Sequence, residues 1–177
     1  MATFAEYILN EEDLDKKMAI VEMLKRRDGI FYNETVTFKT DLAKLFIETM
    51  NLDVDENLVL TACLLYGCQK DDNPQDFHKI RTYAAEGAEY LRTLGFDERF
   101  CRICEGHNRY TIARKREYES DLLEVIDQFG AMLLHRQERP SYSIEDAICL
   151  LESRNLKGKP NQFMELFKEF LNKNLVG

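Results

Sequence analysis

The chain has 177 residues, close to the size of one large domain, and its 45% hydrophobic content is sufficient to enclose a core. The formal net charge of -8 repels phosphate backbones and anionic lipids, which argues against nucleic-acid polymers and membrane surfaces as partners. No stretch reaches the ~20 apolar residues of a membrane span, and the acidic N-terminus is unlike a signal peptide. We therefore expect a cytoplasmic protein, in which the odd number of five cysteines indicates free thiols.

The first predicted element is an amphipathic helix over residues 11–27, followed by Asp28-Gly29 and a short extended stretch over 30–37. Its apolar face comprises Leu14, Met18, Val21 and Leu24. We expect residues 1–33 to form a helical leader that acts as a homodimer or partner surface. The helical domain itself is expected to cover residues 34–177.

Three helices are predicted next, over residues 36–51, 55–66 and 76–94. The middle helix is apolar on nearly all sides, so it should lie at the centre of the fold. The residues expected to face the core are Phe38, Leu42, Leu45 and Phe46 in the first helix and Ile80, Tyr83, Ala84, Gly87, Ala88 and Leu91 in the last. Gly95 is expected to end the last of the three.

Asp97 is predicted to cap the next helix, whose apolar spacing directs His107 toward the core. The helix after it contains Asp127 within an apolar stretch, where a carboxylate needs a polar partner. The same helix contains Gly130, at a cost of about 1 kcal/mol relative to Ala.

Two more helices complete the predicted fold. One begins with a capping box formed by Ser143 and Asp146. The apolar face of the last helix comprises Phe163, Leu166, Phe167, Phe170 and Leu171. Because the chain has only 8 Gly and 3 Pro and lacks segments of alternating polarity, we predict an all-α fold, a single bundle of about seven to nine helices.

Four segments of the chain together resemble a known family. They are LLYGCQK at 64–70, RTYAAEGAEYL at 81–91, GHNR at 106–109 and IDQFGAM at 126–132. Their order and spacing, over about residues 34–171, resemble the HD superfamily of metal-dependent phosphohydrolases, most closely its HD-GYP branch of cyclic di-GMP phosphodiesterases. The resemblance implies an HD-domain-like helical bundle.

Most metal ligands of that family have no counterpart here. The degenerate ligand positions are Tyr66 and Gly67 at the family's His-Asp pair, Tyr83 at a metal-binding histidine and Gly106 at the first of two adjacent histidines. The family's first histidine would fall near Thr35 or Phe38, and its Gly-Tyr-Pro loop is missing. Only His107 and Asp127 match metal-binding residues of the family.

The chemistry of the family, as the resemblance implies, requires two or three bridged metal ions with several protein ligands each. One imidazole and one carboxylate cannot supply that number, and a neutral phenol or a glycine adds no ligand at pH 7. We therefore expect no catalytic residues and no cofactor, with Tyr66 and Tyr83 filling the vacated volume and Gly67 ending its helix. His107 and Asp127 should hydrogen-bond to each other or to the tyrosine hydroxyls. The alternative is a divalent transition metal held by these two residues.

The spacing of Cys101, Cys104 and His107 is also compatible with three zinc ligands on one side of a helix, with Cys63 or Cys68 as a fourth. Cysteines on one regular helix are more often small apolar core residues. We prefer that interpretation and keep zinc as the alternative.

Three basic residues match positions that the family uses near substrate phosphates, namely Lys70, Arg136 and Arg139. The resemblance implies that they retain a nucleotide-binding pocket. Alternatively, they form ion pairs with the abundant surface carboxylates.

The function expected from the sequence is that of a catalytically inactive HD-GYP-like domain, which acts by protein or nucleotide binding in bacterial signalling. One alternative is a residual metal-dependent phosphohydrolase acting on a cyclic dinucleotide or another phosphoester, with carboxylates such as Glu86 completing its site. Another is a metal-free sensor of cyclic di-GMP or a nucleotide.

Overall fold

The computed structural model describes residues 34–70, 77–111, 116–134, 140–155 and 161–175. Within these ranges the protein contains helices and no strand, which confirms the predicted all-α fold. The helices are α3 (Glu34–Met50), α4 (Glu56–Leu65), α5 (Phe77–Thr93), α6 (Glu98–Gly106), α7 (Tyr118–Leu133), α8 (Ile144–Asn155) and α9 (Met164–Leu175). The predicted leader, residues 1–33, lies outside the described residues.

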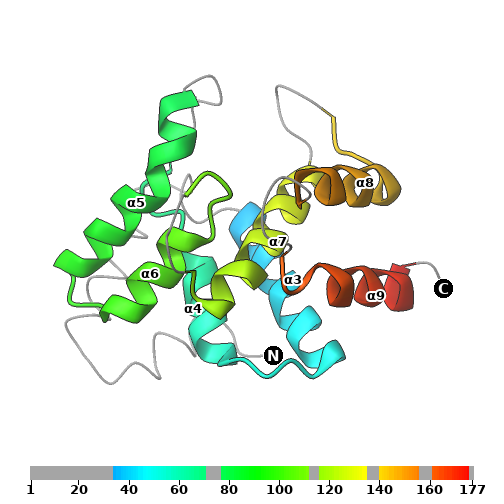
Figure 1. Cartoon of the computed structure of the whole chain (residues 1–177), viewed down its shortest axis with the longest axis horizontal. Coiled ribbons are helices and arrows are strands. Elements are labelled where there is room, and N and C mark those ends of the chain that lie inside the picture. Colours follow the sequence, from blue (N-terminus) through cyan, green and yellow to red (C-terminus); the bar gives the residue numbers. More distant parts are fainter. Residues whose placement is uncertain (1–33, 71–76, 112–115, 135–139, 156–160, 176–177) are drawn as a thin grey trace.

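Helix α7 occupies the middle of the bundle, with α5 and α6 on one side and α8 and α9 on the other (Figure 1). It packs against α3, α4, α6 and α8, while α5 packs on α6 and α9 packs on α3. Helix α4 is buried on most sides and contacts α3, α6 and α7, as its continuous apolar sequence predicts. Residues of α3, α4, α6 and α7 therefore meet in the interior.

Polar residues fix several helix ends at the predicted positions. The Asp97 side chain accepts a hydrogen bond from the backbone N–H of Phe100 at 3.0 Å, and Ser143 accepts one from the N–H of Asp146 at 3.1 Å. Gly95 has a φ of 85°, which a glycine adopts without strain, and it follows the end of α5. These three predictions are confirmed.

The core has an aromatic part between α3, α7 and α9. The ring of Phe46 lies 6.5 Å from that of Phe163, 5.0 Å from Phe167 and 5.2 Å from Phe170, between ring centroids. Phe129 of α7 contacts Phe167 edge to face at 5.1 Å. All five side chains are buried, and we call them the aromatic core. Such rings bury large apolar areas and prefer these tilted and edge-to-face arrangements.

Three local predictions are wrong. Helix α3 begins at Glu34, so the predicted extended stretch over 30–37 is helical from that residue on. Leu45 and Leu166, which were expected to face inward, are 48% and 37% exposed. On α3 the buried positions are instead Lys39, Ala43, Phe46 and Ile47, whose spacing defines a face that includes a lysine.

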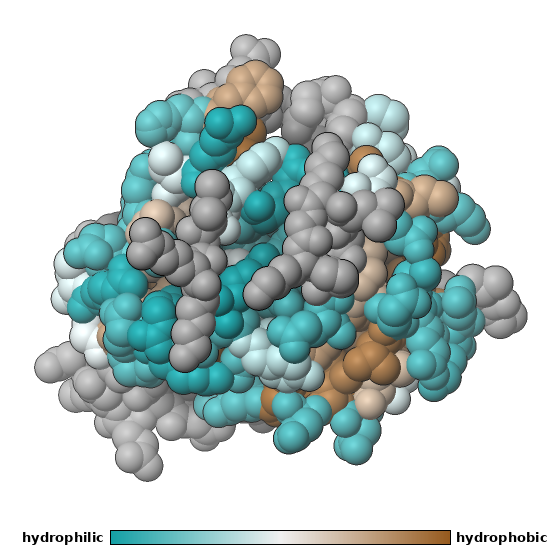
Figure 2. Space-filling model, viewed as in Figure 1, coloured by the Kyte–Doolittle hydropathy of each residue, from teal (hydrophilic) through white to brown (hydrophobic). Residues whose placement is uncertain are grey.

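The surface is mostly polar. Hydrophilic residues cover most of the face in view, and hydrophobic residues gather near α3 and α9 (Figure 2). The exposed Leu45 and Leu166 belong to these two helices. In the part of the chain that the structure describes, no helix is both long and apolar enough to cross a membrane.

Candidate functional site

Asp127 of α7 is the centre of a largely buried ion pair. Its Oδ1 accepts a hydrogen bond from the Lys39 ammonium of α3 at 2.6 Å and another from the Tyr66 hydroxyl at 2.9 Å. The side chains of Lys39 and Asp127 are 4% and 17% exposed. Burial alone would raise the pKa of Asp127, but the positive charges of Lys39 and Lys70 outweigh this effect and hold that pKa well below its usual value.

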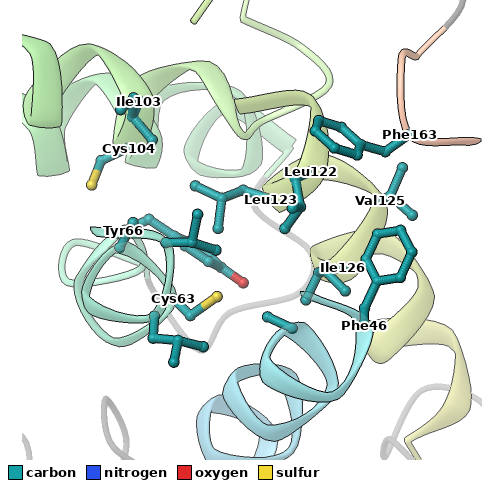
Figure 3. Close-up of a cluster of buried hydrophobic side chains, with 14 of the residues drawn as sticks. Phe46, Cys63, Tyr66, Ile103, Cys104, Leu122, Leu123, Val125, Ile126 and Phe163 are labelled. Atoms are coloured by element: carbon teal, nitrogen blue, oxygen red, sulfur yellow. The ribbon is translucent and has the colours of Figure 1, made fainter. Parts of the chain in front are cut away.

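Tyr66 brings the end of α4 to this carboxylate. It is the C-cap of α4, and its backbone N–H donates to the Ala62 carbonyl at 2.8 Å. Figure 3 shows its hydroxyl pointing toward the space between α3 and α7. Burial, with a further contribution from Asp127, raises the pKa of Tyr66 well above its usual value. The phenol therefore stays protonated and acts as a hydrogen-bond donor.

His107, the C-cap of α6, is fully buried and uses both ring nitrogens. Its Nδ1 contacts the Cys104 carbonyl oxygen, and its Nε2 lies 2.8 Å from the Tyr83 hydroxyl. Because a carbonyl oxygen only accepts, Nδ1 carries the proton and Nε2 accepts from Tyr83. Burial lowers the pKa of His107 to about 4, so the imidazole is neutral at pH 7.

A ring contact joins these two groups into one inner polar cluster, which comprises Lys39, Asp127, Tyr66, His107 and Tyr83. The Tyr66 and His107 rings lie 3.9 Å apart between centroids, with planes tilted by 31°. The ammonium of Lys70 lies 5.5 Å from the centre of the Tyr83 ring, at the edge of the cluster. Four helices and the turn after α4 thus bring these polar groups together in the interior.

Two glycines permit close contacts in the interior, Gly130 between α7 and Lys39 and Gly106 between α6 and α7. A Cβ atom at Gly130 would lie 2.7 Å from Cγ of Lys39, so only glycine lets the lysine stem pass α7 on its way to Asp127. A Cβ atom at Gly106 would lie 2.5 Å from Oγ of Ser120. A histidine at position 106 would therefore collide with α7 in this packing.

Gly67 is different, because nothing lies within 4 Å of the position of its Cβ. Its φ is not in the left-handed region, where Gly95 is the only glycine among the described residues. Helix α4 already ends at Leu65, and the chain continues in tight turns in which Cys68 N–H donates to the Leu65 carbonyl at 3.0 Å. Gly67 thus follows the C-cap of α4, as predicted, but it does not adopt the left-handed conformation that favours glycine, and its position has room for a side chain.

The sequence identified most members of the cluster. It predicted that His107 and Asp127 would hydrogen-bond to each other or to tyrosine hydroxyls, and the structure shows the second arrangement. It missed Lys39, although a lysine spaced four, seven and eight residues from the apolar Ala43, Phe46 and Ile47 shares their face. A second charge at an inward position, opposite in sign to that of Asp127, was the available signal.

Other predicted site residues lie elsewhere. Arg136 and Arg139 lie outside the described residues. Glu86, suggested as an additional ligand, is on the exposed side of α5 and forms an ion pair with Lys79. Cys104 is buried, and burial raises the pKa of its thiol well above the usual value.

The metal ions that the family resemblance implies do not fit this arrangement. A metal at Asp127 would lie beside the positively charged Lys39 ammonium, which already binds Oδ1, and a metal at His107 would have to break one of its two hydrogen bonds. Across the described residues, no group of three or more His, Cys, Asp or Glu side chains is arranged to hold an ion.

Comparisons with protein-family models, curated proteins and solved structures find no match to this chain.

Proposed function

We propose that the chain is a degenerate HD-GYP-like domain that acts by binding a protein or a nucleotide in bacterial signalling, without metal-dependent hydrolysis. The observation that carries this proposal is the Lys39 ammonium 2.6 Å from Oδ1 of Asp127. Asp127 matches the family's metal-binding aspartate, so a cation of the protein itself neutralises the carboxylate that would bind a metal ion.

A carboxylate that is largely buried among apolar helices needs a compensating positive charge. A catalytic metal supplies that charge only while it is bound, whereas a lysine supplies it permanently. With Lys39 in place, the domain can remain folded without an ion, as a module that acts only by binding requires. The two tyrosines support the same interpretation, because their hydroxyls occupy an acceptor site on Asp127 and one on His107.

The proposal that the domain binds a nucleotide rests on Lys70, which the family resemblance places near substrate phosphates. Its ammonium lies 5.5 Å from the Tyr83 ring centre, and its charge helps to lower the pKa of Asp127. The proposal that it binds a protein rests on the expectation that residues 1–33 form a partner surface.

The first experiment measures Mn, Fe and Zn per chain in the full-length protein purified without added metal, and cyclic di-GMP hydrolysis with and without added Mn²⁺. We expect much less than one ion per chain and no Mn²⁺-dependent hydrolysis. Two ions per chain, or hydrolysis that requires Mn²⁺, would overturn the proposal in favour of a metal-dependent phosphohydrolase. An increase in melting temperature on addition of cyclic di-GMP without metal would show that the domain binds a nucleotide.

A second experiment removes the lysine by Lys39→His and restores three of the family's ligands by Tyr66→His, Gly67→Asp and Tyr83→His. Because position 67 has free space, its new carboxylate should be tolerated. We expect Mn²⁺ to raise the melting temperature of this variant but not of the wild type. The matched control carries Tyr66→His, Gly67→Asp and Tyr83→His but keeps Lys39 on Asp127, so it should not bind the ion. Equal Mn²⁺ binding by the control and the restored variant would show that Lys39 does not block the site.

A further inference from the structure

Two arginines contact one exposed tyrosine beside the turn that follows α6. The Arg109 guanidinium lies 4.4 Å from the centre of the Tyr110 ring, and the Arg81 guanidinium of α5 lies 5.6 Å from it. Arg109 also donates a hydrogen bond to the Tyr110 hydroxyl. Both distances are within the range of cation–π attraction, which holds two like charges near one ring. We call these three residues the arginine–tyrosine cluster.

The cluster is unusual in this acidic protein because no carboxylate of the described residues neutralises its charges. Arg92, Arg99, Arg102 and Arg116 all form ion pairs with carboxylates. Among the described residues, by contrast, no Asp or Glu forms an ion pair with Arg81 or Arg109. On α5 the residues three and four positions from Arg81 are Phe77, His78, Ala84 and Ala85, so helical neighbours supply no carboxylate either.

The cluster is also held in a fixed place. Asn108 is buried, and its side-chain NH₂ donates to the Ile80 carbonyl of α5 at 2.9 Å. The oxygen of the same side chain accepts from the N–H of Tyr110 at 2.9 Å. These two bonds tie the tyrosine to the residue preceding Arg81. Two guanidinium groups that are already positioned lose less entropy when they bind an anion.

We propose that the arginine–tyrosine cluster binds the dianionic phosphate group of a small phosphate ester. Two guanidinium groups match such a group in charge, and each can form paired hydrogen bonds to its oxygens. A metal ion is not required, because the arginines supply the positive charge. This site is separate from the inner polar cluster, so it does not depend on the function proposed above.

The test is isothermal titration of the full-length protein with ribose 5-phosphate, and separately with inorganic phosphate. We expect Arg81→Gln and Arg109→Gln each to weaken ribose 5-phosphate binding about tenfold or more, since each removes a charge-assisted contact. Tighter binding of ribose 5-phosphate than of inorganic phosphate would support an ester ligand. Equal binding would overturn the ester assignment and identify free phosphate as the ligand.

Three further variants test whether the effect is specific to the arginine–tyrosine cluster. Arg102→Gln removes another exposed arginine, one that is paired with Glu117, and should leave the affinity unchanged. Tyr110→Leu removes the ring that holds both guanidinium groups and should weaken binding, whereas Tyr110→Phe keeps the ring and should weaken it less. Absence of phosphate binding by the wild type, or equal affinities in Arg81→Gln, Arg109→Gln and Arg102→Gln, would overturn the proposal. All affected side chains are exposed, so unchanged circular dichroism should accompany each variant.

Discussion

The aromatic core and the inner polar cluster are held together differently, although α3 and α7 contribute to both. In the aromatic core, Phe46 of α3 and Phe129 of α7 meet α9 through ring contacts that depend on volume and shape. In the polar cluster, Lys39 of α3 meets Asp127 of α7 through charge and hydrogen bonding. Apolar packing needs no particular partner, whereas each buried polar atom does. Changes to the polar cluster should therefore depend on partner and pH in a way that changes to the aromatic core do not.

The largest expected effect is the loss of one member of the buried ion pair. Lys39→Met should reduce the free energy of unfolding by about 3–5 kcal/mol, because Asp127 would remain buried without its cation. Urea unfolding monitored by circular dichroism measures this change. The double variant Lys39→Met/Asp127→Leu should lose less than the single variant, since it leaves no unpaired charge.

A substitution in the aromatic core provides the contrast to the Lys39 and Asp127 variants. Phe46→Ala should also cost about 3–5 kcal/mol, but as a lost apolar contact that no second substitution to an uncharged residue at position 127 repairs. If Lys39→Met and the double variant were equally unstable, the ion pair would not account for the loss.

The second effect concerns pH. His107 has its pKa lowered to about 4 in the folded protein, whereas an unfolded histidine titrates near 6.5. As pH falls from about 6.5 to about 4, the unfolded chain therefore binds a proton that the folded chain does not, and the free energy of unfolding should fall by about 3 kcal/mol. The stability is fully present above this window. Urea unfolding at a series of pH values measures the slope.

Two variants assign that slope to His107. His107→Gln cannot titrate and should lose the pH dependence in this window, whereas the exposed His78→Gln should retain it. Asp127 acts in a separate window, because its lowered pKa means that its contribution is lost only as pH falls below about 4, the unfolded value. An unchanged slope in His107→Gln would contradict the assignment.

The third effect is that of Gly130→Ala on stability, which should have opposite signs in the presence and absence of the Lys39 side chain. Gly130→Ala places a Cβ atom 2.7 Å from Cγ of Lys39, whose ammonium is fixed on Asp127, so it should destabilise the protein by about 1–2 kcal/mol. In a Lys39→Ala background the obstacle is gone, and the same substitution should stabilise the helix by up to about 1 kcal/mol. Thermal unfolding of the four proteins measures both signs. Stabilisation in the wild-type background would show that the lysine stem moves aside easily.

The contrast between the two regions also explains what the sequence predicted. Helix positions, the cap at Asp97 and the buried phenylalanines follow from periodic apolar residues and local capping rules, which neighbouring residues determine. Leu45 was misplaced because the apolar stripe of α3 is wider than the face that α4 and α7 cover. An apolar stripe in the sequence does not specify which part of it the neighbouring helices will cover.

The polar cluster was predictable only in part, since its partners lie far apart in the chain. The resemblance to a metal-binding family brought Tyr66, Tyr83, His107 and Asp127 together, but it gave no indication of Lys39. The sequence separation of 88 between Lys39 and Asp127 places that pairing beyond any local rule. Gly106 was interpreted only as a lost ligand, whereas the approach of Ser120, which the sequence does not reveal, gives it a packing role.

The smallest expected effect compares the two tyrosine hydroxyls. Tyr66→Phe removes one donor from Oδ1 of Asp127, which keeps Lys39, so the loss should be about 1 kcal/mol. Tyr83→Phe removes the donor to Nε2 of His107, which has no other hydrogen-bond partner among the described residues and is fully buried. Its cost should be larger by about 1 kcal/mol, because an unsatisfied buried acceptor bears its full desolvation penalty. Urea unfolding of the two variants at pH 7 measures the difference, and equal losses would show that Nε2 acquires a new partner when the Tyr83 hydroxyl is removed.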